Sequence, residues 1–254
     1  MNKIIWILWF QGFKNTGWLV KQVVESWRIN NPDWVIIYVS DDNLRDYLQD
    51  IDYIYDPSKT ITMQAKSDII RLSLLNRYGG VWTDATMLCM RPLDVWVSDA
   101  IQSSGIWMYH GNGGDMIGYG IASWLIVSEK NGYIISKWKA KCDEYWMNRT
   151  ECHRYNWMDF LFRELYESDE TFRNLWNDVP NIYCEDIGQS HSLAHNSGMV
   201  SNYPDLKRSF EVSPPRALKF WKHWDTDFPD VTTDACLNSN GYFAIQMSKR
   251  GINI

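Results

Sequence analysis

The hydrophobic positions in the first fifty residues predict alternating strands and helices. Residues 3–9 and 35–39 are nearly continuous apolar runs, which is typical of strands buried on both faces. Between them, residues 18–28 carry apolar side chains at helical spacing. This alternation predicts a parallel α/β sheet. Such sheets bind ligands beyond the carboxyl ends of their strands. Three polar residues follow the two strands at that edge: Gln11, Ser40 and Asp41.

The next segment predicts a helix followed by a strand that ends on an acid. Residues 62–78 have helical spacing, and Gly79-Gly80 suits a helix end with positive φ. Residues 81–84 then form a short apolar strand that ends at Asp84. Asp68 and Arg71 are three positions apart on the helix, so they share a face and can touch.

Asp84 is the strongest candidate for a functional residue in this segment. A carboxylate at the end of a strand can bind a divalent cation that bridges two phosphates, and a plain turn aspartate is an equal alternative on spacing alone. For Asp68 and Arg71 a structural ion pair is favoured, with Arg71 as a ligand of phosphate or sugar hydroxyls the alternative. A second acid is expected two positions after Asp84, and the chain has Thr86 there.

The rest of the chain shows no repeat and no clear linker, so we expect a single domain over residues 1–254. Its segments are an irregular, glycine-rich stretch over residues 101–120, a strand over 121–127, and amphipathic helices over 133–146 and 157–166.

Composition and charge narrow the class of protein. The 254 residues carry a net charge of −6, which argues against binding nucleic acid through bulk charge. The five cysteines include no CxxC pair, which favours a reduced, cytoplasmic compartment. The apolar run near the N-terminus is far shorter than the roughly 20 residues that span a membrane, so no transmembrane segment is expected. The 15 tryptophans fit core packing and, less strongly, sugar binding.

Other polar residues are candidates, each with a structural alternative. Lys219, Lys222 and His223 can close over a pyrophosphate, or they form a solvated basic segment. Asp159, in an aromatic helix face, can bind an acceptor hydroxyl or act as general base. A capping or surface role is an equal alternative for Asp159. Asp115, in the glycine-rich stretch, has similar alternatives.

Three segments together resemble a known family. Residues 5–12, 26–34 and 67–94 resemble the capsular polysaccharide synthesis family, and residues 121–146 fit more loosely. These are GT-A type glycosyltransferases, related to the initiating mannosyltransferases of yeast and to the catalytic cores of glucosylating toxins. The resemblance implies a GT-A-like, Rossmann-type mixed sheet flanked by helices.

The resemblance also implies how the donor and the acceptor bind. About residues 1–95 would form the nucleotide-sugar-binding part, and about residues 96–254 the part that binds the acceptor and closes over the site. Trp9 and Gln11 would lie near the base and the ribose of the donor. The donor sugar would be held by Asp68 and Arg71.

The metal and the leaving group are assigned by the same resemblance. Asp84 corresponds to the first acid of the family's DxD motif, and Thr86 takes the place of the second. The implied cofactor is Mn²⁺ or Mg²⁺, held by Asp84 with Thr86 and a later residue such as His223. Lys219, Lys222 or His223 would neutralise the diphosphate leaving group.

We therefore expect a metal-dependent glycosyltransferase that uses a nucleotide-sugar, with UDP preferred over GDP, and a hydroxyl of a glycan acceptor. Relatives of this pattern tend to retain the anomeric configuration, which requires no dedicated base, so Asp159 would bind acceptor only. If transfer is inverting, Asp159 or Asp115 is the base candidate. The alternative is a non-catalytic nucleotide-sugar- or glycan-binding protein with a decayed metal site, which Thr86 supports.

Overall fold

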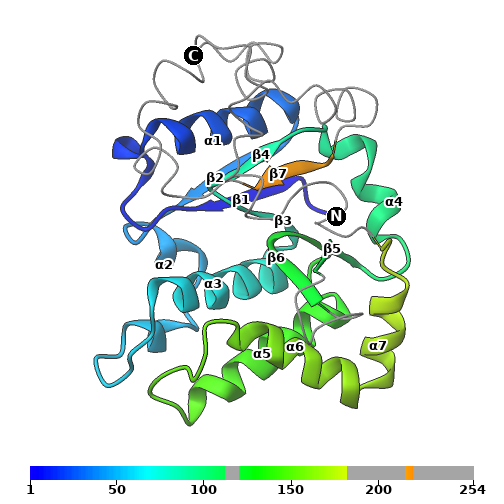
Figure 1. Ribbon diagram of the computed structural model, residues 1–254. Coiled ribbons are helices and arrows are strands. Elements are labelled where there is room, and N and C mark those ends of the chain that lie inside the picture. The colour runs from blue at the N-terminus through cyan, green and yellow to red at the C-terminus, as the bar shows by residue number, and fades with distance from the viewer. Residues whose placement is uncertain (112–119, 182–214, 220–254) are drawn as a thin grey trace.

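The computed structural model describes residues 1–111, 120–181 and 215–219, which are coloured in Figure 1. Their centre is a five-stranded sheet in the order β2-β1-β3-β6-β5. Its strands are β1 (Ile4–Leu8), β2 (Val35–Val39), β3 (Gly80–Asp84), β5 (Ile106–Gly111) and β6 (Gly120–Ser128). β1 is parallel to β2 and to β3, whereas β6 is antiparallel to β3 and to β5. The expected mixed α/β sheet is confirmed.

Helices cover both faces of this sheet. In Figure 1, α1 lies on one face, while α3 lies on the other with α5 and α6 beyond it. The helices are α1 (Trp18–Asn30), α2 (Leu44–Tyr47), α3 (Met63–Tyr78), α4 (Val97–Ile101), α5 (Tyr133–Met147), α6 (Trp157–Ser168) and α7 (Glu170–Asn177). A second sheet pairs β4 (Met87–Cys89) with β7 (Ala217–Lys219), which are antiparallel.

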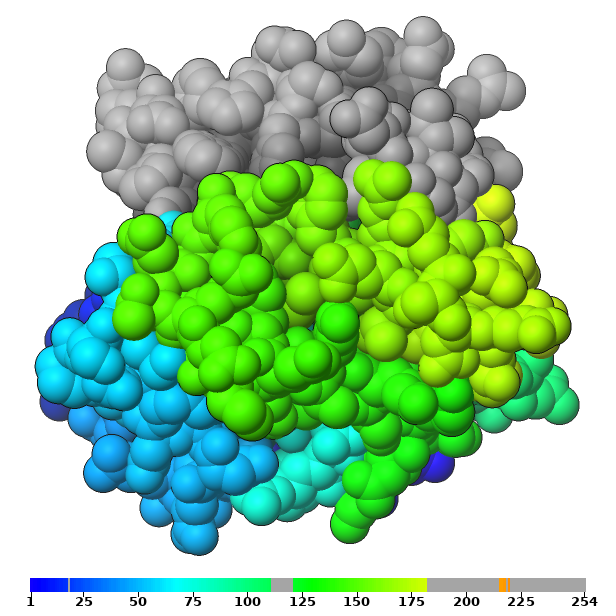
Figure 2. Space-filling view, turned by 90° about the horizontal axis from the view of Figure 1, so that it is seen from below, coloured from blue at the N-terminus to red at the C-terminus, as the bar shows by residue number. Residues whose placement is uncertain are grey.

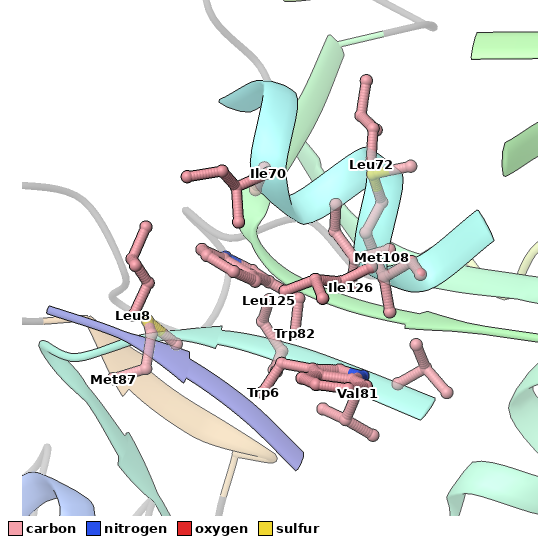
Figure 3. Packing of buried hydrophobic residues seen from close by; sticks show 14 of the residues in the cluster. Trp6, Leu8, Ile70, Leu72, Val81, Trp82, Met87, Met108, Leu125 and Ile126 are labelled. Carbon is pink, nitrogen blue, oxygen red and sulfur yellow. The ribbon is translucent and has the colours of Figure 1, made fainter. Parts of the chain in front are cut away.

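The buried hydrophobic residues form one cluster between the sheet and its helices (Figure 3). Trp6 of β1 and Trp82 of β3 are each 1% exposed, and the Trp6 indole donates to the carbonyl of Gly79 at 3.0 Å. Packing is therefore the role of most large aromatic side chains that the structure describes. The fully buried tryptophans are Trp6, Trp27, Trp82, Trp107, Trp138, Trp146, Trp157 and Trp176.

The prediction of irregular chain over residues 101–120 is wrong for part of that segment. β5 occupies Ile106–Gly111 and pairs with β6 through most of its length. The first of the glycines that suggested a loop, Gly111, is the last residue of β5, and Ile106, Trp107 and Met108 are buried against β6. Short elements that the sequence pattern also missed are α4, α7 and β7.

The order of the strands marks the ligand edge of the sheet. The chain passes from β1 to β2 on one side and then to β3 on the other, so the strand order reverses between β1 and β3. Ligands of α/β sheets bind at such a reversal, outside the carboxyl ends of the strands. Leu8, at the end of β1, pairs with Val39 of β2 and with Asp84 of β3. Asp84 therefore lies at the reversal.

Within the described ranges, no helix is both long and apolar enough to cross a membrane.

Candidate functional site

Two glycines set the path from α3 to Asp84. Gly79 ends the helix with φ 68°, and its N–H donates to the carbonyl of Leu75 at 2.8 Å. Gly80 follows with φ 99°, and a Cβ there would lie 2.5 Å from the carbonyl oxygen of Ile4. Only glycine accepts both this conformation and this close approach. The chain can therefore turn directly from α3 into β3, and β3 ends at Asp84.

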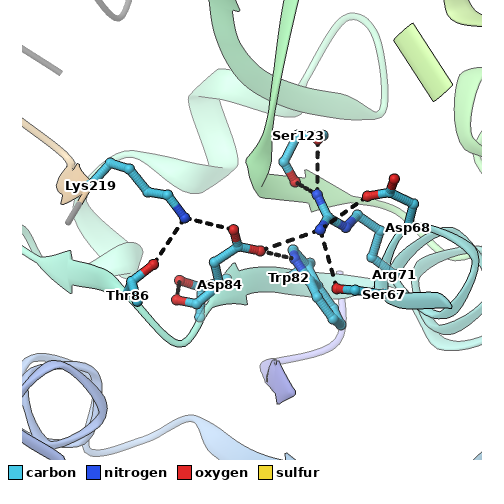
Figure 4. Close-up of polar contacts among 9 residues, drawn as sticks. Ser67, Asp68, Arg71, Trp82, Asp84, Thr86, Ser123 and Lys219 are labelled. Carbon is cyan, nitrogen blue, oxygen red and sulfur yellow. Dashed lines mark hydrogen bonds and ion pairs between the residues drawn. The ribbon is translucent and has the colours of Figure 1, made fainter. Parts of the chain in front are cut away.

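Arg71 is the centre of a buried polar cluster at this edge (Figure 4). Its guanidinium donates to the carbonyl oxygen and the hydroxyl oxygen of Ser123, both at 2.8 Å. A second guanidinium nitrogen donates to Ser67 Oγ at 3.2 Å. The same nitrogen lies 3.2 Å from the Asp68 carboxylate and 3.5 Å from that of Asp84. The contact between Asp68 and Arg71, expected from their spacing, is confirmed.

Asp84 also contacts a second cation, Lys219. The Lys219 Nζ donates to Asp84 Oδ2 at 2.7 Å and to Thr86 Oγ1 at 2.9 Å. The other oxygen of Asp84 accepts from the Trp82 indole at 3.1 Å. Lys219 reaches this position because β7 pairs with β4, with Lys219 opposite Met87. The cluster thus consists of two carboxylates and two cations, Asp68, Asp84, Arg71 and Lys219, which we call the charged cluster.

The two carboxyl groups of the charged cluster ionise differently. Burial raises the pKa of Asp84, but Lys219 and Arg71 outweigh it and hold that pKa below its ordinary value. For Asp68 burial dominates: its pKa is raised to about 6 although Arg71 opposes this, and the charge on Asp84 raises it further. At neutral pH the two carboxylates nearly balance the two cations, so the charged cluster carries little net charge.

Asp159 is the other acid whose ionisation is perturbed. It lies in the first turn of α6. Burial raises the pKa of Asp159 to about 7, the charge on Asp68 raises it further, and Arg71 opposes. The ionisation of Asp159 therefore depends on the charges of Asp68 and Arg71, two members of the charged cluster. A pKa close to 7 suits a group that exchanges a proton at neutral pH.

The raised pKa of Asp159 makes stability depend on pH. Its ordinary value is 3.8, so between about pH 4 and 7 the folded state binds more protons than the unfolded state. The free energy of unfolding therefore falls as the pH rises through this window. We expect Asp159→Asn to unfold at a higher temperature than wild type at pH 8, and to differ little at pH 4.5.

Thermal unfolding at the two pH values checks this. Because Asp68 and Asp159 interact, the difference between the two proteins reports the ionisation of Asp159 together with its coupling to Asp68. Asp99→Asn, at an exposed position of α4, is the matched control and is expected to match wild type at both pH values. A variant that is destabilised more at pH 8 than at pH 4.5 would contradict the assignment.

The remaining candidate residues lie partly inside and partly outside the described structure. Trp9 and Gln11 follow β1 at the same edge as Asp84; Trp9 is half-buried and Gln11 is exposed. Their predicted contact with the base and ribose stays a prediction. Three other candidates, Asp115, Lys222 and His223, lie outside the described residues.

The donor set of the expected metal site can be tested against this geometry. Asp84 and Thr86 offer one carboxylate and one hydroxyl, and the Lys219 ammonium lies in contact with both. A cation such as Mg²⁺ is usually held by one or two carboxylates of the protein together with substrate phosphates and waters, so the number of protein ligands does not exclude it. The ammonium in contact with both Asp84 and Thr86, however, would repel the metal. Among described residues, no three His, Cys, Asp or Glu side chains form a group that could hold a metal ion. This arrangement does not fit a divalent cation.

Sequence reasoning missed three partners of the charged cluster. Ser67 and Ser123 hold the Arg71 guanidinium, and Trp82 donates to Asp84. Ser67 lies one turn before Arg71 on α3, so helical spacing gives a signal for it. Nothing in the sequence indicates Ser123, because β6 brings it to Arg71 across 52 positions.

Acidic and basic side chains thus meet at a strand-order reversal, which is where α/β sheets bind their ligands. The profile of the family described as "Capsular polysaccharide synthesis protein" matches residues 1–203. The chain belongs to this family.

One curated relative and two solved structures are similar to the chain. "Glycosyltransferase afumC" of Aspergillus fumigatus (strain CBS 144.89 / FGSC A1163 / CEA10) is 26% identical over 208 residues, which is 75% of this chain and 44% of the relative. The chain thus spans less than half the length of that relative. The structure "PaToxG Glycosyltransferase" is 15% identical with a TM-score of 0.44, covering 70% of this chain and 74% of that one. The glycosyltransferase GlyE of Streptococcus pneumoniae TIGR4 is 9% identical with a TM-score of 0.42, covering 100% of this chain and 61% of that one.

Proposed function

We propose that this protein is a glycosyltransferase that moves a sugar from a nucleotide-sugar to a hydroxyl of a glycan acceptor. Family membership and the relative named as a glycosyltransferase support the reaction class. The observation that carries the proposal is the charged cluster at the strand-order reversal, where Lys219 and Arg71 both contact Asp84. Two cations, Lys219 and Arg71, lie together at the carboxyl ends of the strands, and this suits a ligand with two phosphates.

In this proposal the donor lies across the carboxyl ends of β1 and β3. Trp9 and Gln11 bind its base and ribose, with UDP preferred over GDP on the resemblance to the family. Asp68 accepts hydrogen bonds from the hydroxyls of the donor sugar, and Arg71 orients Asp68 through their 3.2 Å contact. Neighbouring groups of the charged cluster then hold the sugar and the diphosphate. This fixes the position and orientation of the bond between them, which is the bond that breaks.

The bond between the anomeric carbon and the diphosphate breaks as the acceptor oxygen bonds to that carbon. Negative charge grows on the leaving diphosphate, and the Lys219 ammonium and the Arg71 guanidinium stabilise it. We propose retention of configuration, in which the departing phosphate oxygen takes the acceptor proton and Asp159 only binds acceptor. Inversion would instead use Asp159 as the base, and its pKa of about 7 is compatible with that role. NMR of the product anomer separates the two.

No step of this proposal passes through a metal ion. The Mn²⁺ or Mg²⁺ requirement stays a prediction from the resemblance, and the contact of Lys219 with Asp84 and Thr86 opposes it. A non-catalytic nucleotide-sugar-binding protein is the second candidate. It is favoured by Thr86, which cannot replace the charge of a second acid.

Release of nucleoside diphosphate from a panel of UDP-, GDP- and dTDP-sugars tests the proposed function. We expect wild type to release it from one donor, with and without Mn²⁺. Asp84→Asn should lower the rate at least about 100-fold, because Lys219 and Arg71 lose the charge that positions them. Asp99→Asn removes a carboxylate at an exposed position of α4 and should match wild type. Binding without release, equal in wild type and Asp84→Asn, would support the non-catalytic candidate.

A further inference from the structure

An open groove of about 580 Å³ runs between the end of α5 and the start of α6. In Figure 2 these helices, coloured green to yellow-green, occupy much of the face seen from below. The side chains that line the groove include Tyr145, Arg149, His153, Arg154 and Phe160. Its wall thus combines aromatic rings and basic groups with two glutamates, Glu144 and Glu164, both of which are paired with Lys141.

A second cavity, of about 340 Å³, adjoins this groove. His153, Arg154 and Trp157 line both. Its lining includes Ala65, one turn before Asp68 on α3, and Tyr155, whose pKa is raised by burial and by the charges of Asp68 and Asp84. The groove and the cavity together therefore form a track that ends beside the charged cluster.

Two arginines of the groove lack the carboxylate partners that are usual for surface cations. Arg149 lies 4.6 Å from the ring centre of Tyr145, and Arg154 lies 3.9 Å from that of Phe160. Neither makes an ion pair within the described part of the chain, whereas Lys141 in the same groove contacts two glutamates. A guanidinium stacked on a ring keeps its N–H groups in a plane, where they can bind an anion.

Hydrogen bonds fix His153 so that Tyr145 can donate to a ligand. Arg149 can only donate, so His153 Nε2, at 2.6 Å, accepts from it. The ring proton is then on Nδ1, which donates to the Tyr145 hydroxyl oxygen at 2.8 Å. The backbone N–H of His153 also donates to that oxygen, at 3.4 Å. Because the Tyr145 oxygen accepts two hydrogen bonds from His153, its own proton is left for another acceptor, and Tyr145 lines the groove.

We propose that this track binds an acidic glycan, a saccharide chain that carries carboxylate or phosphate groups. The exposed ring of Tyr155 packs against a sugar ring, Arg149 and Arg154 pair with the anionic groups, and the Tyr145 hydroxyl donates to a ring substituent. The glycan would be the acceptor of the transfer, and that part of the inference rests on the proposed function. Charge complementarity selects an acidic glycan over a neutral one.

Calorimetric titration of the full chain without donor tests the track. The probes are an oligogalacturonate, a phosphorylated malto-oligosaccharide and an unmodified malto-oligosaccharide of equal length. We expect wild type to bind an acidic probe at least ten times more tightly than the neutral one. Arg149→Gln with Arg154→Gln should remove that preference. Arg28→Gln with Lys130→Gln, which removes equal charge from exposed positions on α1 and in the turn after β6, should keep it.

Each outcome decides the inference. Preference for the oligogalacturonate assigns a carboxylate glycan to the track, and preference for the phosphorylated probe assigns a phosphate glycan. Equal binding of all three probes, no binding, or a preference that survives in the Arg149/Arg154 variant overturns the proposal. Donor turnover by wild type is measured separately, so loss of the proposed function and loss of the track are distinguished. Thermal unfolding confirms that each variant is folded.

Discussion

A Lys219→Met variant is expected to transfer sugar about 100- to 1000-fold more slowly than wild type, which is the usual cost of removing one group that stabilises developing charge. The ammonium lies 2.7 Å from Asp84 and 2.9 Å from Thr86, where it can move to the diphosphate without crossing the site. Nucleoside diphosphate should also bind about 10- to 100-fold more weakly, since a hydrogen bond to a charged group is worth roughly 1.5–3 kcal/mol. Steady-state kinetics and calorimetry measure the two effects.

Measuring transfer with and without a divalent metal ion shows whether Lys219 or a bound metal ion stabilises the diphosphate. We expect wild-type transfer to continue in EDTA, and Lys219→Arg to recover part of the rate that Lys219→Met loses. Lys137→Met, at an exposed position of α5, is the matched control and should behave as wild type. If EDTA abolishes wild-type transfer and Mn²⁺ restores it, the ammonium is not the group that stabilises the diphosphate. The metal prediction would then be correct.

The largest loss of stability is expected from Arg71→Met. The Arg71 side chain is 8% exposed. Its guanidinium lies 3.2 Å from the carboxylate of Asp68 and 3.5 Å from that of Asp84. Removing one partner of a buried ion pair costs about 3–5 kcal/mol, because the other charge remains buried without compensation. We expect urea unfolding to show a loss of this size at pH 7. Donor turnover should be lost as well, since Arg71 orients Asp68.

Two further variants decide whether charge is the cause. Arg77→Met makes the same substitution on the same helix, where the side chain is 44% exposed, and should cost less than about 1 kcal/mol. Asp68→Asn added to Arg71→Met should recover part of the lost stability, because it removes the uncompensated carboxylate. If the double variant is no more stable than Arg71→Met, the loss reflects packing and hydrogen bonds to Ser123.

The parts of the fold with strong periodic patterns were predictable from the sequence. β1, β2, α1, α3 and β3 follow from apolar spacing and from Gly79-Gly80, whose positive φ values match the predicted helix end. β5 was missed because Gly111 and the glycines after it suggested a loop, although the preceding residues pair with β6. Short elements such as β7 carry too few residues for periodicity to show, and their partners lie far away in the chain.

The site was predictable only where it depends on local spacing. The contact of Asp68 with Arg71 is a helical neighbour contact, and the position of Asp84 follows from the strand that ends there. The sequence pattern indicated Lys219 as a candidate in a basic segment. It could not show that the Lys219 ammonium contacts Asp84 and Thr86. That contact depends on the pairing of β4 with β7, a long-range event that no local pattern encodes.

The pairing of β4 with β7 has a consequence for the order of folding. Thr86 and Lys219 are separated by 133 residues, whereas Asp68, Arg71 and Asp84 lie within one helix and the strand after it. Closing a long loop is slow, and N-terminal segments emerge first during synthesis. We therefore expect Arg71 to compensate the charge of Asp84 early in folding, and Lys219 to reach Asp84 and Thr86 late. A chain that has already buried its hydrophobic core can still be inactive, so activity should appear after compaction in refolding kinetics.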